Sequence, residues 1–334
     1  MKPFTIFLFT YIFFQQATAQ CWNLVWKDEF KGSALNSSKW SASDDPMTYS
    51  AEEEYYTSRS QNVSVVNNKL QLTALHEMFS GKNYTSGKII SKEKFSFSYG
   101  KIEARMKLPT GKGCWPAFWL LPQDLYYGSW PESGGIDIME MISQNPSTLY
   151  STIHCTDVDN GTHGSTQSSA TLSSGKFSDG YHVFTCEWDP DQFRFYLDGV
   201  LFGTKNKTSY PNFNWPFDRP FYIILNLAIG GGWAEPADPN DYPQTMYVDY
   251  VKVYQLNNQL AITGNNLAQP DVKASYSLPS ISGATYNWSV SGGGTIASGG
   301  TGSTVKLTGI LLQEAEPFRR QLPLPVVILL SLFP

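Results

Sequence analysis

The sequence has few charged residues, few cysteines and no long apolar run, and each shortage excludes a class of protein. Charged residues make up 16% of the 334 positions and the net charge is −5, so the chain lacks the basic surface that nucleic-acid binding requires. No stretch approaches the roughly 18 apolar residues that span a bilayer. The four cysteines match no zinc-binding pattern. We therefore expect neither a nucleic-acid partner nor a membrane span.

Sustained helical periodicity is also missing, whereas short strand patterns are frequent. Residues 63–66 and 69–74 predict a hairpin closed on Asn67-Asn68. Polar and apolar residues alternate with period two in segments 100–108, 193–199 and 246–254. The apolar run 221–229 predicts a central strand buried on both faces. These patterns predict an all-β fold, an antiparallel two-sheet sandwich of the jelly-roll, concanavalin-like type.

The first residues have the features of a secretory signal peptide. Lys2 supplies a positive charge, residues 4–14 are apolar, and Ala17-Thr18-Ala19 is a small-x-small cleavage site. We therefore expect residues 1–19 to be removed and the protein to be secreted and extracellular. An oxidising compartment would allow one or two disulfides in any of three pairings. The cysteines are Cys21, Cys114, Cys155 and Cys186, and a Cys114–Cys155 pair could brace a site. Asn-x-Ser/Thr sequons at Asn36, Asn62, Asn83, Asn160, Asn206 and Asn287 fit an exposed secreted surface.

Composition changes near residue 255. The predicted sandwich occupies residues 20–255, and residues 256–310 are rich in Ser, Gly and Thr. Two strand patterns, at 285–291 and 303–307, make this second segment similar to the immunoglobulin-like PKD modules of many secreted bacterial enzymes. Such domains usually need roughly 80–100 residues, so we interpret the module as partial. Residues 311–334 continue no strand pattern and suggest a truncated or frame-shifted terminus; a cleaved lipid-anchor signal is the alternative, disfavoured by Pro323 and Pro325.

The segment 130–142 carries the chemistry. Side chains two apart on a strand share a face, so residues 135 and 137 point together. Glu140 would point the other way on a regular strand, but one extra residue in a bulge, which we place at Met139, returns it to the face of Asp137. Ile136 and Ile138 then face the core. Two carboxylates on one face are costly without a functional reason.

This segment resembles the laminarinase-type β-glucanases of glycoside hydrolase family 16. That family carries Trp-Pro-x-x-Gly-Glu-Ile-Asp-Ile-Met-Glu, and the chain has Trp-Pro-Glu-Ser-Gly-Gly-Ile-Asp-Ile-Met-Glu from Trp130 to Glu140. Flanking segments are similar to the family in the same order, so that the resemblance covers about residues 22–254. They are 86–90, 95–107, 115–121, 187–190, 226–233 and 248–254.

The resemblance implies a retaining mechanism with two carboxylates and a covalent glycosyl-enzyme. It assigns Glu140 as the acid/base and Asp137 as an auxiliary residue that orients and tunes the pair. The nucleophile position is occupied by Gly135, which has no group that can attack. Loss of a nucleophile typically costs about 10⁴-fold or more in rate. It should also lower the pKa of Glu140 by removing a neighbouring charge. Glu132 is a poor substitute, because it has the wrong parity and lies in a predicted turn.

Other site residues follow from the resemblance or from residue type. Core packing is the rival explanation for each tryptophan, and a structural role is the rival for the histidine. The candidates for substrate contact are Trp115, Trp119, Trp130, Trp233, His154, Asn226 and Arg105. The chemistry requires no cofactor. A structural Ca²⁺, as many family members bind, would involve Glu29 and Asp249, although calcium needs about 6–8 oxygens.

The sequence thus favours a secreted protein of the retaining endo-β-1,3-glucanase type that binds or cleaves β-1,3-glucan, with catalysis impaired by Gly135. The first alternative is a non-catalytic β-1,3-glucan recognition protein. A structural adhesion module, suggested only by the immunoglobulin-like segment, is another. The bulged motif favours β-1,3-glucan over mixed-linkage lichenan, whereas galactan as a substrate stays open. We expect a monomer.

Overall fold

The computed structural model describes residues 22–46 and 50–256, and six short strands beyond them. Two compact units divide the chain, one of Trp22–Gln255 and one of Met1–Cys21 with Leu256–Pro334. The predicted signal peptide lies outside the described residues. In the part of the chain that is described, no helix is long and apolar enough to cross a membrane.

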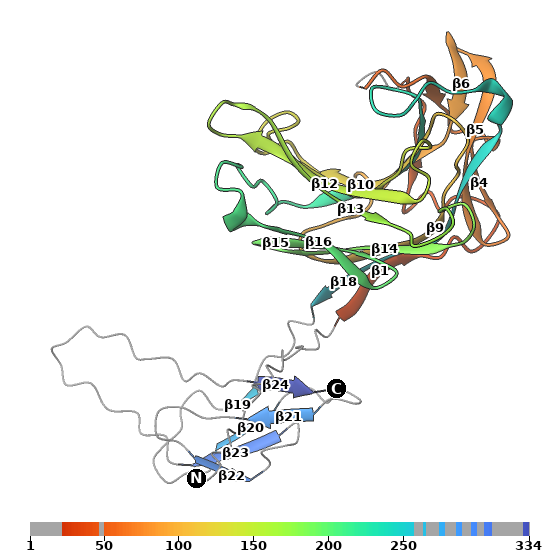
Figure 1. Ribbon diagram of the computed structural model, residues 1–334. Helices are drawn as coiled ribbons and strands as arrows, with labels where there is room; N and C mark the ends of the chain where they lie inside the picture. Colours follow the sequence, from red (N-terminus) through yellow and green to blue (C-terminus); the bar gives the residue numbers. More distant parts are fainter. Residues whose placement is uncertain are drawn as a thin grey trace, which may run out of the picture. The chain divides into compact units, whose positions relative to one another are not determined.

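The unit Trp22–Gln255 consists of two facing β-sheets (Figure 1). The ten-stranded first sheet has the order β16-β15-β14-β9-β18-β5-β6-β3, with β1 on β18 and β4 on β5. Its strands are β1 (Trp22–Asp28), β3 (Glu54–Tyr56), β4 (Val63–Val66), β5 (Lys69–Phe79), β6 (Lys82–Ser86), β9 (Gly100–Lys107), β14 (His182–Asp189), β15 (Gln192–Leu197), β16 (Val200–Asn206) and β18 (Gln244–Leu256).

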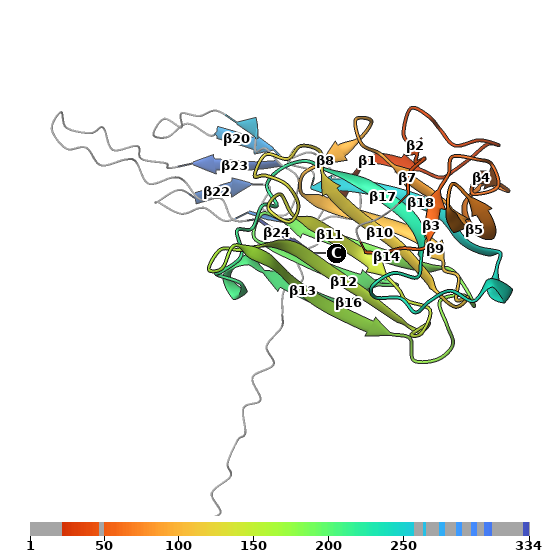
Figure 2. The ribbon, with the colours of Figure 1, turned by 90° about the horizontal axis from the view of Figure 1, so that it is seen from above.

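The second sheet has eight strands in the order β13-β12-β11-β10-β17-β7-β2, with β8 on β17. Its strands are β2 (Ser41–Ala42), β7 (Lys88–Ile90), β8 (Ser96–Phe97), β10 (Cys114–Pro122), β11 (Gly135–Glu140), β12 (Thr148–Asp157), β13 (Thr162–Thr171) and β17 (Phe221–Ile229). Two short 3₁₀ turns, η1 (Lys207–Ser209) and η2 (Pro239–Asp241), lie between strands. Figure 2 shows the second sheet over the first. The predicted jelly-roll sandwich is confirmed.

Local sequence explains the strands that support the site. Asn67 and Asn68 both have positive φ, 53° and 56°, as a two-residue hairpin turn requires, and they join β4 to β5 as predicted. Along β9 every second residue is buried, which matches the predicted alternation. All nine residues of β17 are buried, and the strand lies between β10 and β7, so the prediction of a central strand is confirmed.

The core lies between the two sheets. Phe118, Leu120 and Ile136 enter it from the second sheet, and Ile102 and Phe195 enter it from the first. Burying a large apolar side chain contributes roughly 1.5–3 kcal/mol, so these inward faces hold the sheets together. The opposite face of the second sheet, which we call the cleft face, is turned away from this core.

The predicted brace between Cys114 and Cys155 is wrong. Cys114, Cys155 and Cys186 are free and buried, so the described residues contain no disulfide, and Cys21 lies outside them. Sheet order supplies the reason. Cys114 is on β10 and Cys155 on β12, with β11 between them, and strands two places apart are separated by roughly 9–10 Å. Disulfides bridge Cα atoms only about 4.4–6.8 Å apart.

One predicted sequon is also unsuited to glycosylation. Asn62 is fully buried, and its amide donates to Thr73 O at 2.9 Å and to Thr85 Oγ1 at 3.0 Å. The side chain is therefore part of the packing between strands, and the prediction of an exposed acceptor at Asn62 is wrong. The sequons at Asn36, Asn83, Asn160 and Asn206 lie on exposed residues, and Asn287 lies where side chains are not described.

The other unit contains six described strands in two sheets. β19 (Thr263–Gly264), β20 (Ala274–Ser277), β23 (Thr304–Thr308) and β22 (Thr295–Ser298) form one sheet in that order. β21 (Thr285–Trp288) pairs with β24 (Leu330–Phe333) in the other. The expectation that residues 311–334 contain no strand is therefore wrong at β24, whose alternating Leu-Ser-Leu-Phe suits a strand. The immunoglobulin-like assignment stays a prediction.

Candidate functional site

Strand β11 presents a row of three positions on the cleft face. Asp137 is opposite Trp119 on β10, and Glu140 is opposite Ala117. Pairing with β10 passes directly from Asp137 to Met139, so Ile138 has no partner there, and its carbonyl accepts a bond from Ser151 Oγ at 2.6 Å. The predicted bulge is present, although the unpaired residue is Ile138 rather than Met139. Its effect is to bring Glu140 to the face of Asp137 and Gly135.

Ile136, Ile138 and Met139 behave as the bulge requires. All three side chains are buried in the core between the sheets. Because a bulge places two residues opposite one, the core receives both Ile138 and Met139 while the acidic residues stay outside. The strand therefore separates apolar from acidic side chains despite the three-residue spacing.

Glu140 is the best placed proton donor of the row. Trp115 Nε1 donates to Glu140 Oε1 at 2.9 Å. Burial raises the pKa of Glu140 well above its ordinary value, the charge of Asp137 raises it further, and the Trp115 hydrogen bond opposes both effects. Even with glycine at position 135, burial and the charge of Asp137 are thus enough to raise the pKa of this carboxyl, which favours its protonated form.

Two histidines extend the site from Asp137. His154 Nε2 lies 2.6 Å from Asp137 Oδ2, and His154 Nδ1 lies 2.8 Å from His163 Nε2. Burial lowers the pKa of His154, but the charge and hydrogen bond of Asp137 outweigh it, so that the net shift is upward. Burial and the charge of His154 lower the pKa of His163. If the His154 ring is protonated, its two N–H groups can donate to Asp137 and to His163, so that each of these three side chains has a hydrogen-bond partner.

Gly134 and Gly135 differ in whether their positions can hold a residue with a side chain. Gly134 has φ +82°, and a Cβ there would lie 3.0 Å from Phe217 and Pro216, so glycine is needed. At Gly135 a Cβ would meet Leu121 Cδ2 at 3.6 Å, Trp130 Nε1 at 3.6 Å and His154 Cβ at 3.8 Å, which are ordinary contacts. The backbone at Gly135 therefore accepts a side chain, directed to the face that carries Asp137.

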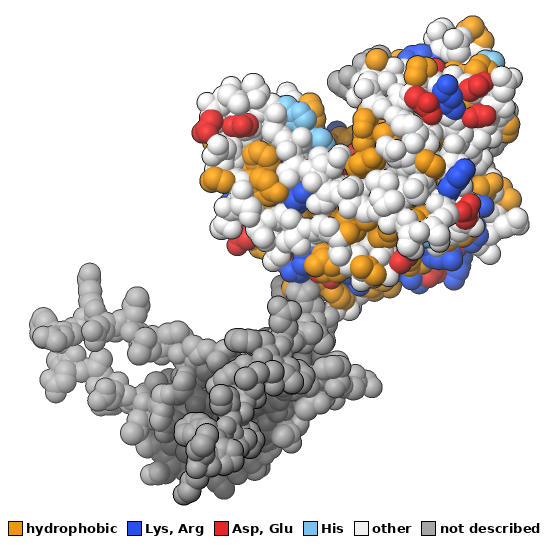
Figure 3. All heavy atoms as spheres, in the orientation of Figure 1, with side chains coloured by type: hydrophobic (Ala, Val, Ile, Leu, Met, Phe, Trp, Pro, Cys, Tyr) orange, Lys and Arg blue, Asp and Glu red, His pale blue; other side chains and the backbone are white. Residues whose placement is uncertain are grey.

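The predicted aromatic residues surround this row. Trp115 and Trp233 meet edge to face at 5.4 Å between centroids, and Trp130 lies 4.7 Å from the ring of His163. Trp119 Nε1 donates to Asn226 Oδ1 at 2.7 Å. Four predicted tryptophans, Asn226 and His154 are thus brought together with Asp137 and Glu140. Figure 3 shows a hollow in this unit with histidine side chains gathered on one wall.

A buried hydrogen-bond chain continues from Trp119 into the molecule. Asn226 Nδ2 donates to the Tyr56 hydroxyl at 3.0 Å, and this hydroxyl contacts the carboxyl of Glu54. Glu54 is fully buried, and Ile229 N donates to its Oε2 at 2.8 Å. Burial raises the pKa of Glu54 to about 8. Because Asn226 accepts from Trp119, its amide group must donate to Tyr56, which fixes the direction of the chain.

Arg105 is not part of this group, and its prediction as a substrate contact is wrong. It lies on β9 of the first sheet and points outward, since Ala104 and Met106 on either side are buried. Its Nη1 donates to Asp249 Oδ2 at 2.6 Å. Alternation along the strand therefore directs Arg105 away from the core and from the second sheet.

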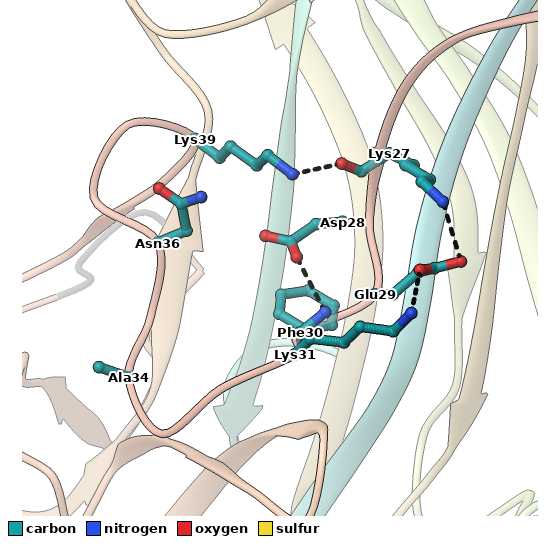
Figure 4. Close-up of a pocket in the computed structure, with 8 residues that line it drawn as sticks. All are labelled: Lys27, Asp28, Glu29, Phe30, Lys31, Ala34, Asn36 and Lys39. Atoms are coloured by element: carbon teal, nitrogen blue, oxygen red, sulfur yellow. Dashed lines mark hydrogen bonds and ion pairs between the residues drawn. The ribbon is translucent and has the colours of Figure 1, made fainter.

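The two predicted calcium ligands do not fit that role. Lys69 and Arg105 neutralise Asp249, with Lys69 Nζ at 2.7 Å. Glu29 is paired with Lys27 at 3.3 Å and with Lys31 at 3.0 Å. All three residues line a cavity of about 190 Å³, in which Figure 4 shows Glu29 between the two lysines. The carboxylates of both residues are therefore already paired with cationic side chains. Among the described residues no group of three or more His, Cys, Asp or Glu side chains is placed to hold a metal.

Sequence reasoning missed His163, Tyr56 and Glu54. His163 follows the turn dipeptide Asn160-Gly161, a hairpin signal that would have placed β13 beside β12 and His154. Tyr56 and Glu54 carry no such local signal, because they reach the site from β3 of the other sheet. Glu132, which the sequence analysis rejected as a replacement for the missing nucleophile, lies in the loop before β11, with its carboxylate close to Gly128.

Comparison with known proteins relates this architecture to glucan-active proteins. Residues 50–273 match the model of the glycosyl hydrolases family 16. The glucan endo-1,3-beta-glucosidase A1 of Niallia circulans is 41% identical over 261 residues, which are 70% of this chain and 38% of that protein. The beta-1,3-glucan-binding protein of Penaeus monodon is 35% identical over 171 residues, 44% of this chain and 47% of that protein. This chain therefore spans less than half of the length of either relative.

The solved structure of an endo-beta-1,3-glucanase from Pyrococcus furiosus superposes with a TM-score of 0.66 at 36% identity. The superposition covers 71% of this chain and 95% of that structure. The similarity thus extends over nearly the whole of that solved chain.

Proposed function

Because the chain belongs to glycosyl hydrolases family 16, we propose that it is a secreted β-1,3-glucan-active protein whose hydrolysis is impaired by Gly135. The observation that supports this proposal is the row on β11. Glu140 with its raised pKa, Asp137 hydrogen-bonded to His154, and an unstrained Gly135 lie on one face, with tryptophans around them. The row has the layout of a retaining glycosidase with one carboxylate missing.

Each remaining residue has a role in that proposal. Glu140 holds the proton that a leaving glycosidic oxygen needs, and Trp115 orients its carboxyl. Asp137 keeps the pKa of Glu140 high through its charge, while His154 holds Asp137 in place. Without a carboxylate at position 135, no side chain stabilises the oxocarbenium-like centre from the opposite side. In this proposal, binding is retained and turnover is impaired.

Reducing-sugar release from laminarin by the full chain and by Gly135→Glu tests the proposal. We expect little release by the parent and an increase of about 10⁴-fold in the variant, the typical contribution of a nucleophile. Gly135→Gln is the matched control, because it adds the same volume without a nucleophile. The double change Gly135→Glu, Glu140→Gln should be silent. A parent that cuts laminarin as fast as Gly135→Glu would overturn the assignment of the nucleophile position.

The second candidate is a β-1,3-glucan recognition protein that never cuts. Gly135 favours it, as does the similarity to a protein named for binding beta-1,3-glucan. The preserved Glu140 with its raised pKa, and the ordered Asp137–His154 contact, favour the impaired hydrolase. The same experiment separates the two candidates. A Gly135→Glu variant that binds laminarin but stays inactive supports the recognition protein.

Secretion is the remaining part of the proposal. It rests on the apolar segment 4–14 and the small residues Ala17 and Ala19. Mass determination of the N-terminus of protein exported from an expressing cell tests it. A mature chain that begins near Gln20 is expected, and an unprocessed cytoplasmic chain would contradict the prediction.

A further inference from the structure

A group of exposed apolar residues lies on the loop that joins β10 to β11. Leu125, Tyr126, Tyr127 and Trp130 are 62%, 67%, 41% and 54% exposed, and we call them the aromatic rim. The loop connects the two strands that carry Trp119 and Asp137, so it is anchored at the candidate site on both sides. Clustered apolar exposure of this kind usually marks a binding surface.

Polar contacts hold the rim in place despite its exposure. Tyr127 donates its hydroxyl to the carboxylate of Asp218, at 2.9 and 2.8 Å from the two oxygens. Arg219 lies over the ring of Tyr126, 4.4 Å from the centroid, and its Nη2 donates to Asp124 Oδ2 at 2.9 Å. Rings that are already held lose little conformational freedom when a ligand binds. The rim is therefore a preorganised surface.

The rim is continuous with the candidate site. Trp130 Nε1 would lie 3.6 Å from a side chain at position 135, and the Trp130 ring packs on His163. His163 in turn bonds His154, the partner of Asp137. A polysaccharide bound on the cleft face at Gly135 would therefore extend past Trp130 and onto the aromatic rim.

We propose that the aromatic rim binds a distal part of the same polysaccharide chain, beyond the units held on the cleft face. This inference rests on the proposed function. Tyrosine rings offer a flat apolar face to sugar C–H groups, and the hydroxyl of Tyr127 with the carboxylates of Asp124 and Asp218 offers partners for sugar hydroxyls. Carboxylates beside the rings disfavour an aliphatic partner or a membrane surface. The rim makes affinity depend on glucan length.

Binding of laminarin and of laminaritriose to the full chain tests this proposal. The variant is Leu125→Ser with Tyr126→Ala, which leaves the anchoring Tyr127 intact. The matched control is Val200→Ser with Leu201→Ser, because those residues are 69% and 49% exposed on β16 of the other sheet. Calorimetry should show laminarin affinity reduced about fivefold in the rim variant, as expected for one lost stacking contact, and unchanged trisaccharide affinity. The control should bind both like the parent.

Four other outcomes would overturn the inference. Equal loss for both sugars would place the rim residues within the cleft, and no loss for either would remove them from binding. A change in sedimentation with unchanged laminarin binding would identify the rim as a contact between copies of the chain. A parent that binds neither sugar would remove the proposed function together with this inference, whereas the first three results leave the proposed function intact.

Discussion

At the scale of single residues, two neighbouring glycines make opposite demands on the chain. Gly134→Ala places a Cβ at positive φ against Phe217 and Pro216, so we expect a loss of about 1–3 kcal/mol in the free energy of unfolding. Gly135→Ala meets only ordinary contacts, and we expect it to be neutral or stabilising by up to about 1 kcal/mol. Urea unfolding of both variants measures the difference. Equal destabilisation would show that position 135 is constrained after all.

Glu54 should give the fold a pH dependence of its own. Its pKa is about 8 in the folded chain and near 4.5 when exposed, so the unfolded chain releases this proton first as the pH rises. The contribution of Glu54 to stability is complete below the lower value and decreases by roughly 1.4 kcal/mol per pH unit up to the higher one. Glu54→Gln should remove that slope between the two values.

The control for this prediction is Glu132→Gln, which replaces a loop carboxylate. Parent and control should lose stability alike from pH about 5 to 8, whereas Glu54→Gln should lose less, by roughly 1.4 kcal/mol per pH unit. The slope that remains in Glu54→Gln is that of Glu140, whose pKa is also raised. Identical slopes in the parent and in Glu54→Gln would mean that the Glu54 carboxyl is ionised in the fold.

Residue type and spacing predicted the acidic row but not the chain behind it. Asp137 and Glu140 are only three residues apart, so the geometry of one strand with a bulge is enough to predict that their side chains share a face. Asn226 and Tyr56 are separated by 170 residues, and no local pattern encodes their contact. Likewise, the alternation along segment 100–108 predicted a strand at Arg105 but could not tell in which sheet that strand lies.

At the scale of elements, the bulge in β11 sets the direction of Glu140. Removing Ile138 leaves Asp137, Met139 and Glu140 in regular alternation, so Glu140 still faces the cleft. Inserting an alanine after Met139 turns Glu140 toward the core. In the Gly135→Glu background we therefore expect laminarin hydrolysis to survive the deletion and to disappear with the insertion. The deletion removes a buried side chain and should cost about 2–5 kcal/mol of stability.

Thermal unfolding must accompany that comparison, since an unfolded insertion variant is inactive for a trivial reason. A folded insertion variant that still cuts laminarin would show that the bulge can move along the strand. The sequence pattern was sufficient to predict this bulge and the hairpin at Asn67-Asn68. It misplaced the unpaired residue by one position, because Ile138 and Met139 are both buried and apolar.

At the scale of the whole molecule, the described residues of the unit Trp22–Gln255 are held together without a disulfide. Burial raises the pKa of Cys114 and Cys155 to about 12, so these thiols are protonated and unreactive in the fold. We expect a reducing agent to change the Tm by less than about 1 °C, because no described cysteine is in a disulfide. A thiol reagent should label Cys114, Cys155 and Cys186 only after unfolding. A Tm that falls by several degrees on reduction would contradict this structure.

The relaxed backbone at Gly135 also has a genetic consequence. A glycine codon that ends in a purine becomes a glutamate codon by one base change, and a Cβ at position 135 meets only ordinary contacts. Under the proposed function we therefore expect gain of the carboxylate to need no compensating mutation elsewhere in the gene. Under the proposed function, a lineage that holds β-glucan and a lineage that digests it are separated by a single copying error.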